Sequence, residues 1–217
     1  VGTLVSSLQI SGGSGDGSIT GTSADGIGLP FADGAGADTT TGAIGLYGTG
    51  AGFGLDIADG ALDTDSGDIT LVGEATATDA TAGVRVTGDG LVTNGGDITV
   101  RGTSAGGVGV QLGDGSDPFA VDSGGGAILI EGTGVTAGVL MQDNQVASGG
   151  GAVTITGEGG ALGVSLDDGS VDSGGGDIAI EGTADDADGI GVSLYAAQLT
   201  GGAGDVIVRG TAAGGIG

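Results

Sequence analysis

The chain has 217 residues, of which 57 are glycine, 28 are acidic and only three are basic, so its formal net charge is −25. Cysteine and histidine are absent, which excludes disulfides, thiolate metal sites and catalysis by a nucleophile with a histidine base. The acidity argues against nucleic acids and anionic membrane surfaces as partners, and no apolar run is long enough to be inserted in a membrane. Because 38% of the residues are hydrophobic, the chain must nevertheless bury an apolar interior.

A unit of about 27 residues recurs along the whole chain. Each unit is expected to hold three short strands, for example 97–102, 108–112 and 119–123. The residue before the first strand marks each unit, and the markers are Asp16, Ala43, Asp68, Asp97, Ala127, Ala152, Asp177 and Asp205.

Apolar residues alternate with polar ones inside these strands, which is typical of half-buried β-strands. In the first strand of a unit two alternating residues are predicted to face inward, such as Ile69 and Leu71. In the second strand three are predicted to do so, such as Phe53, Leu55 and Ile57. No segment has a helical period, and the glycine content disfavours helices.

Two glycines recur once per unit, one after the first strand and one predicted on the outer side of the second strand. Gly48 and Gly54 are an example. Residues that recur at one place in every unit stack if each unit is one turn of a solenoid. The sequence therefore predicts an all-β parallel β-helix (β-solenoid), right-handed, with three short strands per coil and about eight coils. It would form a single continuous segment over residues 1–217.

The two ends of the sequence match each other. Residues 9–16 repeat the pattern of residues 198–205, and 215–217 followed by 1–4 reads like the second strand of a unit. We therefore expect a solenoid open at both ends that is one repeat of a longer chain or filament. Head-to-tail continuation and lateral packing would make the protein its own partner.

Stacking also predicts contacts between charged residues of adjacent coils. Each arginine stands one coil from an acidic residue, and the pairs are Arg85 with Asp56, Arg101 with Glu131, and Arg209 with Glu181. An exposed ion pair contributes less than about 1 kcal/mol, so we interpret these pairs as aids to strand register.

A column of aspartates is predicted at the corner after the second strand: Asp33, Asp59, Asp89, Asp114, Asp143 and Asp168. Each is followed by Gly or Asn, which is a turn signal. Stacked carboxylates also repel unless a cation neutralises them, and Ca²⁺ prefers such oxygen ligands. Both interpretations remain open. A second candidate Ca²⁺ site is the acidic loop with Asp185, Asp186 and Asp188. The protein is expected to require no cofactor, although it could bind Ca²⁺ at these sites.

An enzyme is not expected. Polysaccharide-cleaving β-helices need a cleft with basic and sugar-stacking aromatic residues, whereas this chain has five aromatic residues and no long loop to build a cleft wall. The segment GGSGDG at 12–17 matches the nonapeptide Ca²⁺-solenoid motif only in part, and the outward column beginning at Thr70 is too mixed for an ice-binding array.

The motifs GGDITVRGT, GVGVQL and SGGGDIAIEGT resemble the repeat regions of filamentous-haemagglutinin-like exoproteins and giant bacterial surface adhesins or filament proteins. The resemblance covers the whole chain, although asparagine is scarcer and acidity higher here. It implies an extracellular or cell-surface, secreted protein. The expected function is a structural repeat of a long filament or fibre, and the alternative is the stalk of a secreted adhesin that binds ligands on host or neighbouring cells. Divalent cations are a further expected partner.

Overall fold

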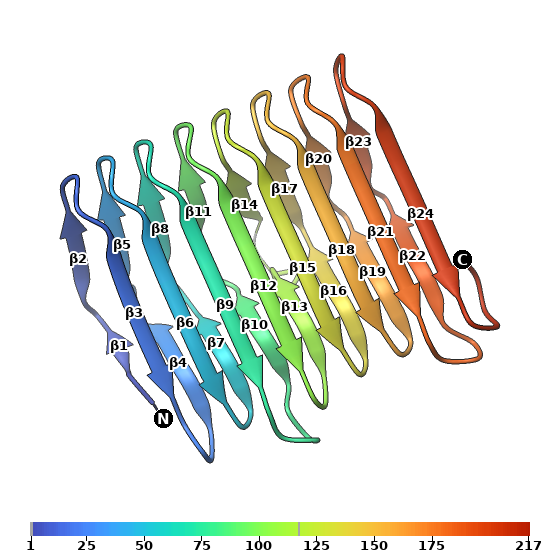
Figure 1. Ribbon diagram of the computed structural model, residues 1–217, viewed down its shortest axis with the longest axis horizontal. Helices are drawn as coiled ribbons and strands as arrows, with labels where there is room; N and C mark the ends of the chain where they lie inside the picture. Colours follow the sequence, from blue (N-terminus) through green and yellow to red (C-terminus); the bar gives the residue numbers. More distant parts are fainter. Residues whose placement is uncertain (1, 117) are drawn as a thin grey trace.

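The computed structural model describes residues 2–116 and 118–217, and these residues form strands and turns without a helix. The strands assemble into three parallel sheets of eight strands each, and one coil of the solenoid takes one strand from each sheet. Figure 1 shows the eight coils side by side from the N-terminus to the C-terminus. The predicted all-β parallel β-solenoid with three strands per coil is confirmed.

The three sheets are named A, B and C. Sheet A contains β1 (Val5–Ser6), β4 (Ile27–Ala32), β7 (Phe53–Ile57), β10 (Ala82–Val86), β13 (Val108–Leu112), β16 (Ala137–Gln142), β19 (Leu162–Asp167) and β22 (Ile190–Tyr195). Sheet B contains β2 (Gln9–Gly12), β5 (Gly36–Thr39), β8 (Ala61–Thr64), β11 (Gly90–Thr93), β14 (Phe119–Asp122), β17 (Asn144–Ala147), β20 (Ser170–Asp172) and β23 (Gln198–Thr200). Sheet C contains β3 (Gly17–Thr22), β6 (Ile44–Gly50), β9 (Ile69–Ala75), β12 (Ile98–Ser104), β15 (Ile128–Gly134), β18 (Val153–Gly159), β21 (Ile178–Ala184) and β24 (Val206–Ala212).

The solenoid winds to the right. In Figure 1 the strands of sheet C lie in front and run downwards, whereas those of sheet B lie behind them and run upwards while the coils advance from left to right. This sense of rotation is the usual one for crossovers between parallel strands.

The core consists of columns of equivalent apolar side chains, one from each coil. In sheet C, for example, Ile98 pairs with Ile69 on one side and with Ile128 on the other. The inward pairs of this sheet from Ile44 to Ile180 are at most 3% exposed. Each such side chain therefore has its counterparts as neighbours above and below, which removes its apolar surface from water.

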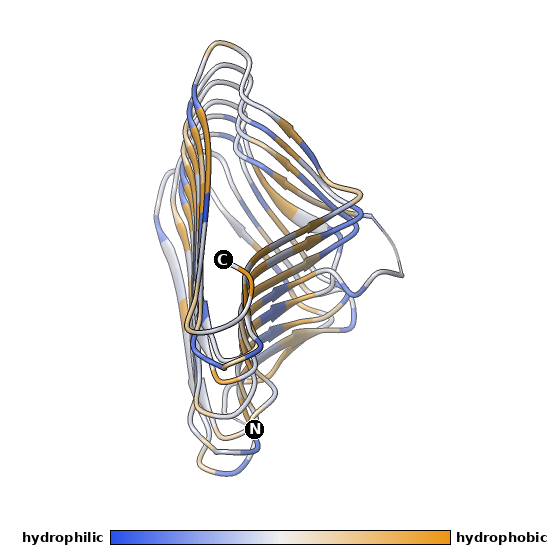
Figure 2. Ribbon diagram, turned by 90° about the vertical axis from the view of Figure 1, so that its right-hand side faces the viewer, coloured by the Kyte–Doolittle hydropathy of each residue, from blue (hydrophilic) through white to orange (hydrophobic). Residues whose placement is uncertain are grey.

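Where sheets A and C come closest, the interior contains glycines instead of side chains. A Cβ atom on Gly48 of sheet C would clash with the carbonyl oxygen of Gly54 of sheet A, and a Cβ on Gly54 would lie 2.6 Å from the carbonyl carbon of Gly73 one coil on. The same clash recurs in the following coils. Figure 2 shows this narrow end of the coil at the bottom, below the wider part that holds the core.

This close approach corrects the predicted orientation of the second strand. Gly54 faces the interior and not the outside, and Leu55 next to it is also buried in the core. The alternation is therefore broken between these two residues, and the strand pairing skips the glycine. As a result Phe53 is turned outward, where the guanidinium carbon of Arg85 lies 4.3 Å from the centre of its ring. Strict period-2 counting missed this because it assumes a regular strand.

A column of buried hydroxyls lines the corner between sheets B and C. Ser148, for example, is 0% exposed and donates to the carbonyl of Gly151 at 2.5 Å, and its hydroxyl is also 3.1 Å from the carbonyl of Ser173 one coil on. Each hydroxyl of the column bonds to the carbonyl three residues later, and the residues are Thr39, Thr64, Thr93, Ser123, Ser148 and Ser173. The column satisfies carbonyls that the glycine-rich corner would otherwise leave buried and unpaired.

We predict that Gly48→Ala destabilises the solenoid, because the added methyl group clashes with the backbone of Gly54. Overpacking of this kind costs about 1–3 kcal/mol, or roughly 2–4 °C of melting temperature per kcal/mol in a chain of this size. Gly52→Ala is the matched control in the same coil, because the nearest atom to its Cβ would be 4.0 Å away. Thermal unfolding followed by circular dichroism measures the difference, and equal melting temperatures for the two variants would contradict the close approach.

We also predict that Ser148→Ala lowers stability by about 1–3 kcal/mol, because it removes the donor to buried carbonyls. Ser165→Ala is the control, since Ser165 lies on the outer side of β19 and is half-buried. Denaturant titration gives both values. The assigned role of the column is wrong if the two substitutions cost the same.

Candidate functional site

The corner between sheets A and B holds four of the six predicted aspartates in one stacked position. Asp33, Asp59, Asp143 and Asp168 all adopt a left-handed backbone conformation, with φ between 50° and 57°. Ser7 and Ala196 have the same conformation in the first and last of these corners. The turn interpretation is thus confirmed for these coils, but the aspartate itself carries the positive φ. Aspartate tolerates this conformation better than most residues with a side chain.

The residue after the aspartate has the predicted positive φ in three of the six corners, at Gly34, Gly90 and Gly115. Gly169 has no positive φ, but a Cβ on it would lie 2.8 Å from the side chain of Leu166 and 3.0 Å from the carbonyl of Asn144. This position points into the core, and its counterpart one coil earlier is the buried Asn144.

Asp89 and Asp114 depart from the stacked position. The strand pairing places Asp89 beside Gly60, one residue later in the corner than Asp59. Asp114 lies in a longer connection between β13 and β14, where Gly113 and Gly115 have the positive φ and the aspartate does not. Its Oδ1 accepts a hydrogen bond from the backbone N–H of Ser116 at 2.9 Å. The pattern of Asp followed by Gly or Asn identified all six corners. It did not show how many residues separate each aspartate from the strands before and after it.

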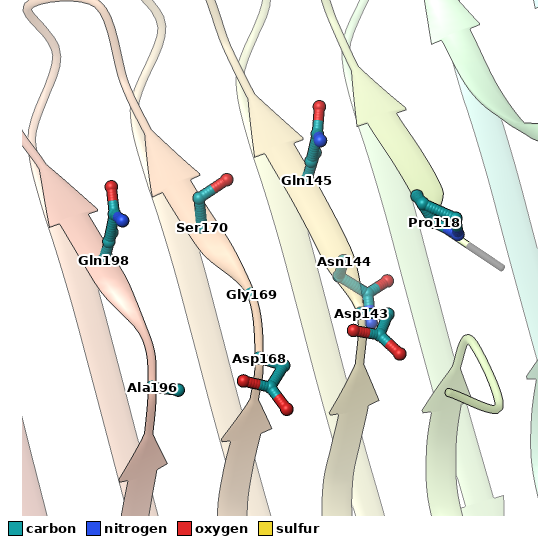
Figure 3. A pocket seen from close by; sticks show the side chains of 9 residues that line it. All are labelled: Pro118, Asp143, Asn144, Gln145, Asp168, Gly169, Ser170, Ala196 and Gln198. Atoms are coloured by element: carbon teal, nitrogen blue, oxygen red, sulfur yellow. The ribbon is translucent and has the colours of Figure 1, made fainter. Parts of the chain in front are cut away.

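A shallow groove of about 330 Å³ runs along this corner in the C-terminal half of the solenoid. Figure 3 shows the carboxylates of Asp143 and Asp168 side by side on neighbouring coils, with polar side chains of sheet B further along the strands. The groove is lined by Pro118, Asp143, Asn144, Gln145, Asp168, Gly169, Ser170, Ala196 and Gln198. Its lining therefore offers mostly oxygen and amide groups.

Asn144 is the buried polar residue of this groove. It is 1% exposed, and its Nδ2 donates to the carbonyls of Leu112 and Gln142, both at 2.8 Å. Its Oδ1 has no hydrogen-bond partner in the structure. The side chain thus ties two neighbouring coils together at the corner.

The acidic loop connects β21 to β22 at another corner of the coil, the one between sheets C and A. Asp185, Asp186 and Asp188 are exposed there, and the first two donate their backbone N–H groups to the carbonyls of Gly159 and Gly160. Asp185 and Asp186 line a groove of about 310 Å³ together with Glu158, whereas Asp188 is not part of that lining.

A further column of aspartates has a structural role that the sequence did not reveal. Asp97, just before β12, accepts a hydrogen bond at Oδ1 from the backbone N–H of Ala127, the equivalent residue one coil on, at 2.7 Å. Asp16, Asp68 and Asp177 make the same forward contact at 2.8–2.9 Å. The sequence did contain a signal for this hydrogen-bonding role, because Asp recurs just before the first strand of a unit. These residues were interpreted only as markers of the repeat.

The three predicted ion pairs between coils are all present. Arg85 binds Asp56 through two nitrogens at 2.7 and 2.8 Å, and the side chain of Asp56 is only 8% exposed. Arg209 lies 2.7 Å from Glu181, and Arg101 pairs with Glu131. The last two pairs are exposed and contribute little, so Arg85 is the most important of the three arginines for register.

Among residues 2–116 and 118–217, no group of three acidic side chains is arranged to hold a metal ion. Carboxylates stacked one per coil would have to share a cation between two coils and complete its shell with carbonyl or water oxygens, which the flexible coordination of Ca²⁺ permits. The Ca²⁺ sites at the corner and in the acidic loop stay a prediction. The described part of the chain also contains no helix that is long and apolar enough to cross a membrane.

Comparisons with family models, with curated proteins and with solved structures found no match to this chain.

We expect Ca²⁺ to raise the melting temperature, and the Asp143→Asn/Asp168→Asn variant to lose part of that rise. A site with a Kd of about 1 mM would add roughly 1.4 kcal/mol at ~10 mM Ca²⁺. Asn keeps the left-handed corner, so the variant tests charge and not folding. Asp63→Asn/Asp65→Asn is the control, because it removes the same charge from two exposed residues outside the groove. Equal Ca²⁺ shifts for both variants and the unmodified chain would exclude the corner as the binding site.

Proposed function

We propose that this chain is a structural block of a long extracellular β-solenoid filament or surface fibre, and that its function is mechanical. The observation that carries the proposal is continuity: each of the three sheets runs through all eight coils in one register. The apolar columns run with them along the block. Such a body resists bending, because bending would open hydrogen bonds between coils in at least one sheet.

Coupling between neighbouring coils supports this function. The backbone ladders, the shared hydroxyl bonds, the forward-reaching aspartates and the Arg85–Asp56 pair all join one coil to the next. In a solenoid stability is the sum of coil and interface terms, so strong interfaces make local opening costly. Because several kinds of contact act between adjacent coils, we expect a stiff rod and not a series of units that move independently.

The acidic exterior fits a filament that must stay soluble and separate from its neighbours. At low ionic strength the net charge of −25 keeps parallel filaments apart. At 0.1 M salt this repulsion is largely screened beyond a distance of about 10 Å. Divalent cations shared between carboxylates of two filaments would bundle them laterally. The extracellular location rests on the resemblance of the repeats to secreted bacterial β-helix proteins.

The stalk of an adhesin is the second candidate, and the polar groove at the Asp143–Asp168 corner favours it. Its carboxylate, amide and hydroxyl groups are of the kind that bind sugar hydroxyls. The groove is shallow and lies on one corner of a long body, so ligand binding would be an addition to the mechanical role.

The mechanical role predicts that two copies of residues 1–217 joined in tandem form one straight rod. Eight coils at ~4.8 Å give a length of about 38 Å per block, so the tandem should measure roughly 77 Å along its axis. Electron microscopy or small-angle scattering measures this length. Two blocks that bend independently at the junction would contradict the proposal, and saturable binding on a glycan array would favour the adhesin.

A further inference from the structure

We propose that the outer face of sheet A binds the same face of a second copy of this chain, so that two solenoids pack side by side. The inference rests on the proposed filament function and names the surface through which filaments pair laterally. It is supported by an apolar column on this face, by the low charge of its strands, and by its flatness and area.

An uninterrupted column of apolar residues runs along the outer side of sheet A. Phe53 faces outward there, because it lies against the guanidinium of Arg85, which pairs with Asp56 on the same side. Equivalent residues of a parallel sheet point to the same face, so the residues paired with Phe53 in the other coils share this orientation. None of them belongs to the core, and the five larger ones are half-buried. The column consists of Ile27, Phe53, Ala82, Val108, Ala137, Leu162 and Ile190.

In the interior coils this column alternates between large and small side chains. Ala82 lies between Phe53 and Val108. Ala137 in turn lies between Val108 and Leu162. Two layers interdigitate without voids when large side chains of one face small side chains of the other. A two-fold axis parallel to the strands, between β10 and β13, places Phe53 of each copy opposite Ala137 of the other. The same axis places Val108 opposite Ala82.

Charge is scarce on the strands of this face. Within the described strands, sheet A contains two acidic residues, Asp56 and Asp167, and one basic residue, Arg85. Sheet B contains four acidic residues and no basic one, and sheet C contains four acidic and two basic ones. Because Arg85 neutralises Asp56, the strands of sheet A retain a single net negative charge. In a chain with a net charge of −25, this is the face on which two copies meet with the least repulsion.

The face is also flat and large enough for a stable contact. Figure 1 shows that successive coils lie nearly parallel to one another. Flat sheets of many strands are unusual and are typically stabilised by stacking against another layer. Eight strands of about five residues give a face of roughly 38 Å by 17 Å. Two copies would therefore bury about 1,300 Å² in total, which lies in the range of specific protein interfaces.

The acidic corners beside the face make the pairing depend on salt. The corner between sheets A and B holds the stacked aspartates, which include Asp59 and Asp143. With the two-fold axis parallel to the strands, Asp59 of one copy lies on the same side as Asp143 of the other. Packed sheets are about 10 Å apart. This separation is well within the Debye length of about 30 Å at 0.01 M salt, but exceeds the length of about 8 Å at 0.15 M. Low ionic strength therefore opposes the pairing, and physiological salt permits it.

Three variants of the chain test the interface. Val108→Asp places a carboxylate in the middle of the apolar column, close to the same carboxylate of the second copy. Leu129→Asp is the matched control, because Leu129 is also a half-buried residue and lies on the outer side of sheet C between Thr99 and Thr154. Val108→Lys is mixed with Val108→Asp, since residues 108 of the two copies lie on either side of the two-fold axis. Circular dichroism first checks that all three variants keep the fold.

Sedimentation velocity measures the association. The unmodified chain and Leu129→Asp should be monomeric at about 0.01 M NaCl and dimeric at about 0.15 M. Val108→Asp alone should dimerise at least ~10-fold more weakly, because like charges then meet in the interface. Mixing it with Val108→Lys should restore dimers. An unmodified chain that stays monomeric at both salt concentrations, or a Val108→Asp variant that dimerises as well as Leu129→Asp, would overturn the proposal. A mixture that stays monomeric would overturn the assigned pairing of the two faces.

Small-angle scattering distinguishes lateral pairing from end-to-end association. In the dimer the cross-section of the particle should increase while its length stays at about 38 Å. Particles that lengthen at constant cross-section would overturn the proposal. The tandem of two blocks tests the filament function separately. A straight tandem rod that does not pair laterally retains the mechanical function and loses only this interface, whereas a tandem that bends at its junction but still pairs has the opposite meaning.

Discussion

Parallel hydrogen bonding between equivalent residues of successive coils is the constraint on which the rest of this structure depends. It places every residue about 4.8 Å from its counterparts above and below. A residue type that recurs once per coil therefore becomes a continuous column, whether it is the Ile98 core column, the Ser148 hydroxyl column or the Asp97 carboxylate column. Buried polar groups are satisfied because each finds its partner in the next coil.

The glycine pairs explain how a coil of this length closes. Gly48 and Gly54 allow two sheets to approach backbone to backbone at one end of the cross-section, while isoleucine, leucine and valine fill the wider part. The high glycine content is thus a requirement of packing and not a sign of disorder. The broken alternation at Gly54 and Leu55 is a consequence of this approach, and it moves Phe53 to the surface, where it meets Arg85.

The outer surface of the solenoid is strongly acidic, because the chain carries 28 acidic residues against three basic ones and most of the acidic side chains are not buried. This charge opposes contact between the sides of neighbouring molecules unless cations neutralise it. The apolar residues lie instead in the columns of the interior, where each packs against its counterparts in the adjacent coils.

The repeat period and the alternation of residues determined the fold class, the three strands per coil, the core residues of sheet C and the three ion pairs, because all of these depend only on which residues stand one coil apart. Only the tertiary structure decided which way the second-strand glycines face, which corner residue adopts the left-handed conformation, and that Asp89 and Asp114 leave the stacked position. These features depend on the distance between sheets A and C and on the number of residues at each corner. A local sequence pattern does not determine either quantity. Both depend on how the sheets, whose strands come from distant parts of the sequence, pack against one another.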